Sequence, residues 1–183
     1  MSIIQTYSEP IDIYVKLVRE GQRLWSSNCP DDKSDHLFNF CVTSLSLRDW
    51  CIKHLGLTGN DRNLFFNVHS SDRYLKYCSD IANMSKHLTL DAGRTTNIAS
   101  LDAVQSEVAR VLPDGVSLSD VISKPSFCLV DIDGSQVDLF YFLFQVLSSW
   151  EGIFKKYNLP YFDDHFKAAV FLESHRVYRT PNK

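Results

Sequence analysis

Apolar residues recur at helical spacing along most of this chain. The clearest case begins at Leu139, where apolar side chains follow at steps of three, one, three, one, three, three, one and three residues as far as Tyr157. This spacing places them on one face of a helix of about five turns. Asp138 precedes the segment as a suitable N-cap, and Pro160 ends the region. The pattern therefore predicts a long helix whose apolar face contributes to the core.

Three helical segments are predicted before it. The first runs from Pro10, a good first helical residue, to a break near Pro30. The second begins with Ser34 as its N-cap and ends at Gly56, and apolar residues cover much of its circumference. We therefore expect it to be the most buried helix. The third segment covers residues 61–90, with a break and a new cap at residues 70–71.

An extended hairpin is predicted between the third segment and the last long helix. Two extended runs flank Asp133 and Gly134, a pair typical of a two-residue turn in which both positions have φ > 0. The hairpin is expected at residues 126–137. Before it, the spacing from Leu101 to Leu112 fits either an amphipathic helix or a strand. A C-terminal helix is expected at residues 163–177.

These elements predict a mainly α fold, a helical bundle of four to six helices with a small β-hairpin inserted before the last long helix. We expect residues 1–183 to form a single domain. Its core helices would lie within residues 10–90 and 138–158, and the rings of Trp50, Phe142, Trp150 and Phe154 would belong to the core.

Composition limits the classes of function. The formal net charge is −3, from 22 acidic and 19 basic residues, which excludes nucleic-acid binding through a broadly basic surface. The five cysteines form no C-x-x-C pair, so neither a zinc site nor a disulfide framework is expected. No secretory signal is visible, and the longest apolar run is too short for a membrane span. We expect a soluble, cytoplasmic chain without metal or cofactor.

The first candidate motif pairs Arg48 with His54. On one continuous helix these side chains point about 120° apart, with an axial rise of about 9 Å. They would meet only if the helix ended near Lys53, or across a symmetric dimer. The alternative is an exposed arginine together with a histidine that interacts with the C-terminal end of the helix dipole.

The second candidate motif contains Asn83 and His87, which are four residues apart on one helix face, with Lys86 adjacent. His87 would act as a general acid or base, Lys86 would stabilise charge on a phosphate, and Asn83 would orient a ribose hydroxyl. Asp80 would fix the tautomer of His87 or pair with Lys76. The alternative is a solvated helix face whose Asn83 and His87 cap nearby backbone.

Both motifs resemble those of HEPN domains, helical proteins in which R-x4-6-H or R-N-x-x-x-H carries metal-independent RNA cleavage. Asn83 and His87 match the N and H places, whereas Ala82 stands in the arginine place, so Arg48 would have to supply that group from a neighbouring helix. Over about residues 34–158 the chain also resembles a group of small bacterial helical proteins without an assigned function. The shared features are Asp49–Trp50, the N-x-S-K-H stretch at 83–87, Asp133–Gly134 and Trp150.

The resemblance implies a HEPN-like protein of a bacterial stress or phage-defence system, such as a toxin–antitoxin pair, that acts on RNA or binds it in a catalytically degenerate form. The implied catalytic residues are Arg48, Asn83, Lys86 and His87, supported by Asp80 and His54. The implied partners are RNA, a second copy of the chain, or a protein from the same operon. The alternative function is non-enzymatic, a protein–protein interaction or structural subunit.

The aromatic content supports that alternative, since 13% of the residues are Phe, Tyr or Trp. Phe140, Tyr141 and Phe144 lie off the predicted core face of the last long helix. Either the C-terminal helix covers them, through Phe166 and Val170, or they form an interface with a partner, because large apolar patches seldom stay exposed on monomers.

Overall fold

The computed structural model describes residues 6–84, 96–111, 118–162 and 166–171. In chain order its elements within these ranges are α1 (Pro10–Ser26), α2 (Pro30–His54), α3 (Gly59–Ser71), α4 (Arg73–Met84), β1 (Ile98–Val111), β2 (Leu118–Asp131), β3 (Gln136–Asp138), α5 (Leu139–Lys156) and the 3₁₀ helix η1 (Phe166–Phe171). The fold is mainly helical, with a small antiparallel sheet before the last long helix, which confirms the predicted fold class.

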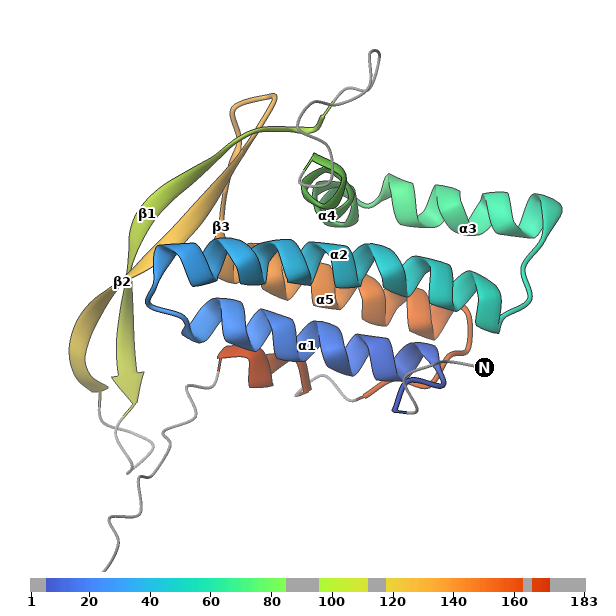
Figure 1. Ribbon diagram of the computed structural model, residues 1–183, viewed down its shortest axis with the longest axis horizontal. Helices are drawn as coiled ribbons and strands as arrows, with labels where there is room; N and C mark the ends of the chain where they lie inside the picture. Colours follow the sequence, from blue (N-terminus) through green and yellow to red (C-terminus); the bar gives the residue numbers. More distant parts are fainter. Residues whose placement is uncertain (1–5, 85–95, 112–117, 163–165, 172–183) are drawn as a thin grey trace, which may run out of the picture.

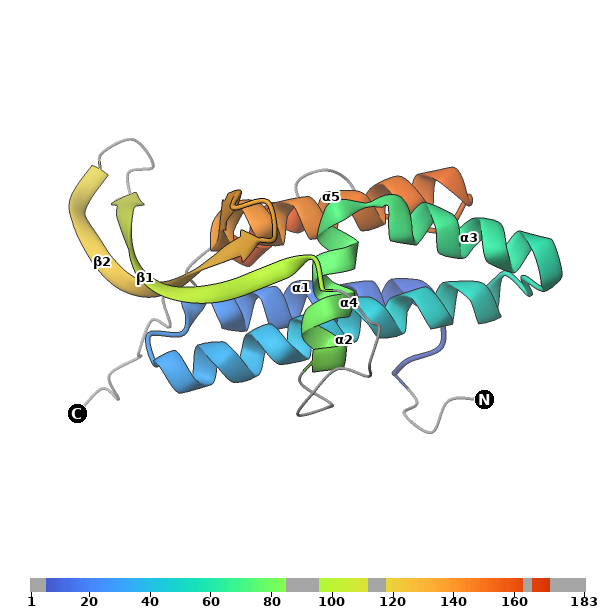
Figure 2. The ribbon, with the colours of Figure 1, turned by 90° about the horizontal axis from the view of Figure 1, so that it is seen from above.

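The helices α1, α2 and α5 form the body of the molecule and run side by side in both views (Figures 1 and 2). Aromatic rings fill the space between them. The ring centroids of Tyr14 in α1 and Phe154 in α5 are 5.5 Å apart, and those of Phe40 in α2 and Phe142 in α5 are 6.1 Å apart. Such rings bury large apolar areas, which is the main favourable contribution to folding.

The expectation that α2 is the most buried helix is wrong. Nine of the seventeen residues of α1 and nine of the eighteen residues of α5 are buried, against eight of the twenty-five in α2. Apolar residues lie on more than one side of α2 because the helix packs on α1 and also on α4. Trp50 is only partly buried and packs at the margin of the core.

Local capping chemistry sets the ends of α2. The helix begins at Pro30 and not after Ser34, because a proline fits the first helical position and needs no N–H partner there. The Ser34 hydroxyl donates to the Pro30 carbonyl within the first turn, at 3.0 Å. At the other end Gly56 has φ +62°, the left-handed conformation that commonly terminates a helix, as predicted.

The predicted break in the third segment is present and separates α3 from α4. It lies at Asp72, one residue after the expected pair, and Asp72 rather than a serine provides the cap. Its Oδ1 accepts hydrogen bonds from the backbone N–H groups of Tyr74 and Leu75, at 2.9 and 3.0 Å. After the break α4 crosses over α2, as Figure 2 shows.

The sheet has the strand order β1-β2-β3 and is antiparallel throughout. The segment from Leu101 onward is a strand, so the helical alternative is wrong, and the sheet begins at Ile98, well before the predicted hairpin. The long β1–β2 ribbon extends past the helices (Figures 1 and 2). Close to the helices, Phe127 and Leu129 of β2 and Val137 of β3 are buried and join the core.

The predicted β2–β3 hairpin is present, although its turn has three residues. The Asp131 N–H donates to the Ser135 carbonyl, and the Gly134 N–H donates to the Asp131 carbonyl, both at 3.0 Å. Of Asp133 and Gly134, only Gly134 has a positive φ, +78°. A glycine in this position is typical of three-residue hairpin loops.

The C-terminal helix is described only over η1, within the predicted residues 163–177. Val170 in η1 is fully buried. Among the described residues, no helix combines the length and the apolar content that crossing a bilayer requires.

Candidate functional site

The polar face of α4 lies against the β2–β3 turn and the start of β1. Between them is a cleft of about 340 Å³, which we call the α4 cleft. Its main lining residues are Arg73, Lys76, Tyr77, Asn97, Asp131, Asp133 and Ser135. The cleft therefore combines two cations, two carboxylates and several neutral hydrogen-bonding groups from segments distant in the sequence.

Asp131 fastens the turn to α4. Its Oδ2 accepts from the Tyr77 hydroxyl at 2.8 Å and from the Arg73 guanidinium, and its Oδ1 accepts from the N–H groups of Asp133 and Ser135 at 2.9 and 3.0 Å. The bond from Tyr77 is the largest cause of a lowered pKa of the Asp131 carboxyl, followed by those from Ser135 and Arg73. Asp131 is therefore ionised at neutral pH and compensates the charge of Arg73.

Asp80 fastens the start of β1 to the same helix. Its Oδ2 accepts from the backbone N–H of Asn97 at 2.7 Å and from the Asn97 side-chain amide at 2.9 Å. The partner that the structure shows for Asp80 is therefore Asn97, which neither sequence-based role includes. Asp80 positions one wall of the cleft.

Lys76 lies between these two anchored points on α4. Its side chain is partly buried along the cleft, and it forms no ion pair with any residue in the part of the chain that the structure describes. Because Arg73 and Asp131 neutralise each other, Lys76 is the cation of the cleft that can contact an incoming anion.

The N-x-S-K-H motif is only partly visible. Asn83 lies in the last turn of α4, partly buried, on the helix that carries Lys76 and Asp80. Lys86 and His87 lie outside the described residues. The geometry of the proposed acid–base pair is therefore not described, and the site residues of this motif stay predictions.

Arg48 and His54 are placed apart from the cleft. The helix α2 ends at His54, one residue after Lys53, and both residues lie within it, so their side chains keep the angular separation of about 120° expected on a continuous helix. Arg48 pairs with Asp49 at 3.0 Å and lies 4.9 Å from the ring centroid of Phe66 in α3. His54 is exposed in the last turn of α2.

The aromatic residues of α5 are partly covered. Phe140 packs against Phe171 of η1, with ring centroids 4.3 Å apart, and Phe144 is partly buried beneath Lys167. Phe140 nevertheless stays 47% exposed and Tyr141 45%. Coverage by the C-terminal segment, the first sequence-based alternative, therefore holds only in part, because η1 packs on Phe140 and leaves nearly half of that residue exposed. The partner interface stays a prediction.

The sequence motifs do not single out Tyr77, Asn97 or Asp131 as site residues. The Asp133–Gly134 turn does place Asp131 at the end of a hairpin, but its partner Arg73 is 58 positions away. No local pattern indicates a contact over that separation.

Among the described residues, no group of three or more His, Cys, Asp or Glu side chains is arranged to hold a metal ion. Comparison with protein-family models, with curated proteins and with solved structures finds no match to this chain. The chemistry of the α4 cleft and of the exposed surfaces is therefore the basis for assigning a function.

Proposed function

We propose that this chain binds RNA at the α4 cleft, as a HEPN-like helical protein of a bacterial stress or phage-defence system in the cytoplasm. The observation that carries the proposal is the position of Lys76, a cation that has no ion-pair partner among the described residues and that lines the cleft together with the neutral polar groups of Tyr77, Asn97 and Ser135. A phosphate is recognised by this combination of a basic side chain with nearby neutral donors. The net charge of −3 requires such a local site, because bulk attraction to a polyanion is missing.

Two further residues of the cleft suit RNA. Asn97 is held by Asp80, so its position is fixed before a ligand arrives. Asp133 is exposed at the turn and presents a carboxylate that can accept a hydrogen bond from a ribose 2′-hydroxyl. The 2′-hydroxyl is the group by which proteins distinguish RNA from DNA.

The binding test is a titration of a labelled RNA oligonucleotide, followed by fluorescence anisotropy. We expect Lys76→Gln to weaken RNA binding by about tenfold. It should also reduce the slope of log affinity against log salt concentration by about one, since one phosphate contact is lost. The matched control is Lys53→Gln, which removes an exposed lysine from the last turn of α2. Equal affinity of wild type and Lys76→Gln would contradict the placement of the RNA.

A separate experiment addresses cleavage, with His87 as general acid or base and Lys86 and Asn83 as its neighbours. In the proposed reaction wild type degrades RNA in the presence of EDTA, and His87→Ala does not. Unchanged cleavage by His87→Ala would overturn the role of that residue. RNA binding without cleavage by wild type would identify the catalytically degenerate form. Arg48→Ala lowers cleavage only if a second copy of the chain brings Arg48 to the cleft.

A second candidate function is protein–protein interaction through α5. The observation that favours it is the exposure of nearly half of Phe140 and of Tyr141 on neighbouring positions of one helix. Exposed aromatic groups of this kind are enriched at protein interfaces. The partner would be a second copy of the chain or a protein encoded beside it.

A further inference from the structure

Two lysines are buried together at the C-terminal end of α1. Lys33 of α2 is 1% exposed and Lys124 of β2 is 3% exposed. The Lys33 Nζ donates to the carbonyls of Leu24 and Trp25, at 2.8 and 3.4 Å. The Lys124 Nζ donates to the same Trp25 carbonyl at 2.9 Å, so the two ammonium groups lie close to each other.

The surroundings of Lys33 leave its ammonium group incompletely satisfied. An ammonium group has three N–H donors. The carbonyls of Leu24 and Trp25 accept two of these, and the third has no acceptor among the described residues. Both acceptors are neutral, whereas a buried charge is normally paired with an opposite one. Burial, and secondly the charge of Lys124, lowers the pKa of Lys33 to about 8, so the group is still mainly charged at neutral pH.

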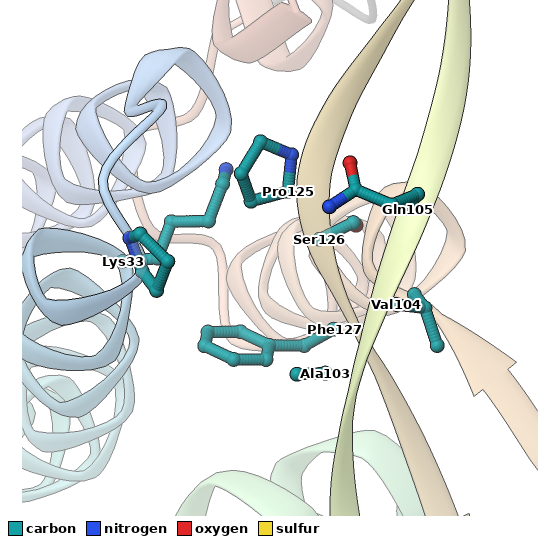
Figure 3. A pocket seen from close by; sticks show the side chains of 8 residues that line it. Lys33, Ala103, Val104, Gln105, Pro125, Ser126 and Phe127 are labelled. Carbon is teal, nitrogen blue, oxygen red and sulfur yellow. The ribbon is translucent and has the colours of Figure 1, made fainter.

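Lys33 also lines a pocket of about 200 Å³ between the first turn of α2 and the β1–β2 ribbon (Figure 3). Gln105 and Ser126 provide its other polar groups, and Ala103, Pro125 and Phe127 provide apolar walls. The Gln105 Oε1 accepts from Ser123 at 3.3 Å, and its amide nitrogen points toward Pro125 and the end of Lys33 in Figure 3. The pocket therefore offers hydrogen-bond donors beside a buried cation, with apolar contact area around them.

We propose that this pocket binds a small monocarboxylate with a short apolar chain. The carboxylate accepts the third N–H of Lys33 and an amide N–H of Gln105, and it supplies the opposite charge that Lys33 lacks. The alkyl part lies against Ala103 and Phe127. The volume limits the ligand to a few carbon atoms, because sites for drug-sized molecules are larger. The site is separate from the α4 cleft and independent of RNA binding.

The test compares butyrate with butyramide, a neutral molecule of nearly the same shape, by isothermal titration calorimetry or ligand-observed NMR. The expected result is saturable binding of one butyrate per chain, with butyramide at least tenfold weaker. Equal binding of the two compounds, or no binding of butyrate, would overturn the proposal, because the recognised feature is the negative charge.

Two variants locate the site. Lys33→Met keeps the length of the buried chain and is expected to lower butyrate affinity by about tenfold or more, whereas Lys53→Met, an exposed control, leaves it unchanged. If Lys33→Met does not fold, Gln105→Leu decides, because Gln105 is exposed on β1 and its replacement tolerates folding. A several-fold loss of affinity in Gln105→Leu supports the site, and wild-type affinity in that variant contradicts it.

Discussion

At the scale of single residues, the least expected feature is the burial of polar side chains. His69 of α3 is 2% exposed, its ring lies 5.5 Å from that of Trp150, and its Nε2 has no hydrogen-bond partner in the part of the chain that the structure describes. Burial first, and then the charge of Arg48, lowers the pKa of His69 to about 4, although Asp72 and Asp49 act in the opposite direction. His69 is therefore held neutral in the folded protein.

This burial predicts acid sensitivity. The ordinary pKa of histidine is 6.5 and that of folded His69 is about 4, so between these values the unfolded chain binds more protons than the folded one. Stability is therefore lost as the pH falls from 6.5 to 4, by on the order of 3 kcal/mol from this group. We expect His69→Phe to remove most of that loss, measured by urea unfolding at pH 7.5 and 4.5. The exposed control His54→Phe should retain the wild-type pH dependence. If His69→Phe loses as much free energy of unfolding between pH 7.5 and 4.5 as wild type does, another group is responsible.

Neither His69 nor Lys33 could be placed from the sequence. Asp32 and Ser34 flank Lys33, so local patterning counts Lys33 with the solvated positions, and the residues beside His69, Val68 and Ser70, do not indicate which ring it packs against. Their burial depends on partners from other elements, such as the ring of Trp150 in α5 and the carbonyls at the end of α1. Sequence patterning assigns a face to a residue, but it does not show which polar groups a tertiary contact will satisfy.

At the scale of elements, the sequence correctly predicts the helix ends that are determined by a capping residue close by in the chain. Gly56 ends α2 and Asp138 caps α5, where the Asp138 Oδ1 accepts from the Tyr141 N–H at 2.9 Å. Ser34 fails as a cap because Pro30 starts the same helix earlier. The segment 98–111 is ambiguous in sequence because Leu101, Val104 and Val108 fit helical spacing, whereas Val104 and Val108 also fit the two-residue period of a strand, and pairing with β2 decides for a strand.

The start of α4 gives a prediction at this scale. Asp72 accepts two backbone N–H groups of α4 through its Oδ1, and its Oδ2 accepts from the Ser149 hydroxyl of α5 at 2.6 Å. Asp72→Ala should therefore lower the free energy of unfolding by about 1–2 kcal/mol. Asp72→Asn should lose less, because an amide oxygen also accepts the capping bonds.

The measurement for these variants is urea denaturation followed by circular dichroism. Ser70→Ala is the control, since Ser70 lies at the break that the sequence predicts but donates only to the Phe66 carbonyl. A change below about 0.5 kcal/mol is expected there. If Ser70→Ala were as costly as Asp72→Ala, capping by Asp72 would not explain the helix start.

At the scale of the whole molecule, the high aromatic content is mainly a property of the interior. Aromatic rings pack between α1, α2 and α5. Gly21 of α1 has no side chain, so the ring of Phe40 in α2 and Val170 of η1 can lie close to the α1 backbone. A Cβ at Gly21 would lie 3.2 Å from the ring of Phe40 and 3.4 Å from Val170. The periodic face of α5 predicts this interior correctly. The α4 cleft could not be predicted, because it forms only when the β2–β3 turn folds back onto α4.

The aromatic residues of α5 that stay exposed predict an interface. Tyr141 is 45% exposed and lies beside Tyr74 of α4, with ring centroids 5.9 Å apart, so it joins the aromatic surface of α5 to the helix of the α4 cleft. If a second copy of the chain binds this surface, Tyr141→Glu places a charge within an apolar contact and should weaken the dimer by at least tenfold. The stability of the monomer should change by less than about 0.5 kcal/mol, because the substitution is on the surface.

Tyr161→Glu is the matched control, since Tyr161 is 51% exposed but lies beyond the C-terminal end of α5. Sedimentation equilibrium measures both variants, and a wild type that stays monomeric throughout the concentration series would exclude a second copy and leave a different protein as the partner of this surface.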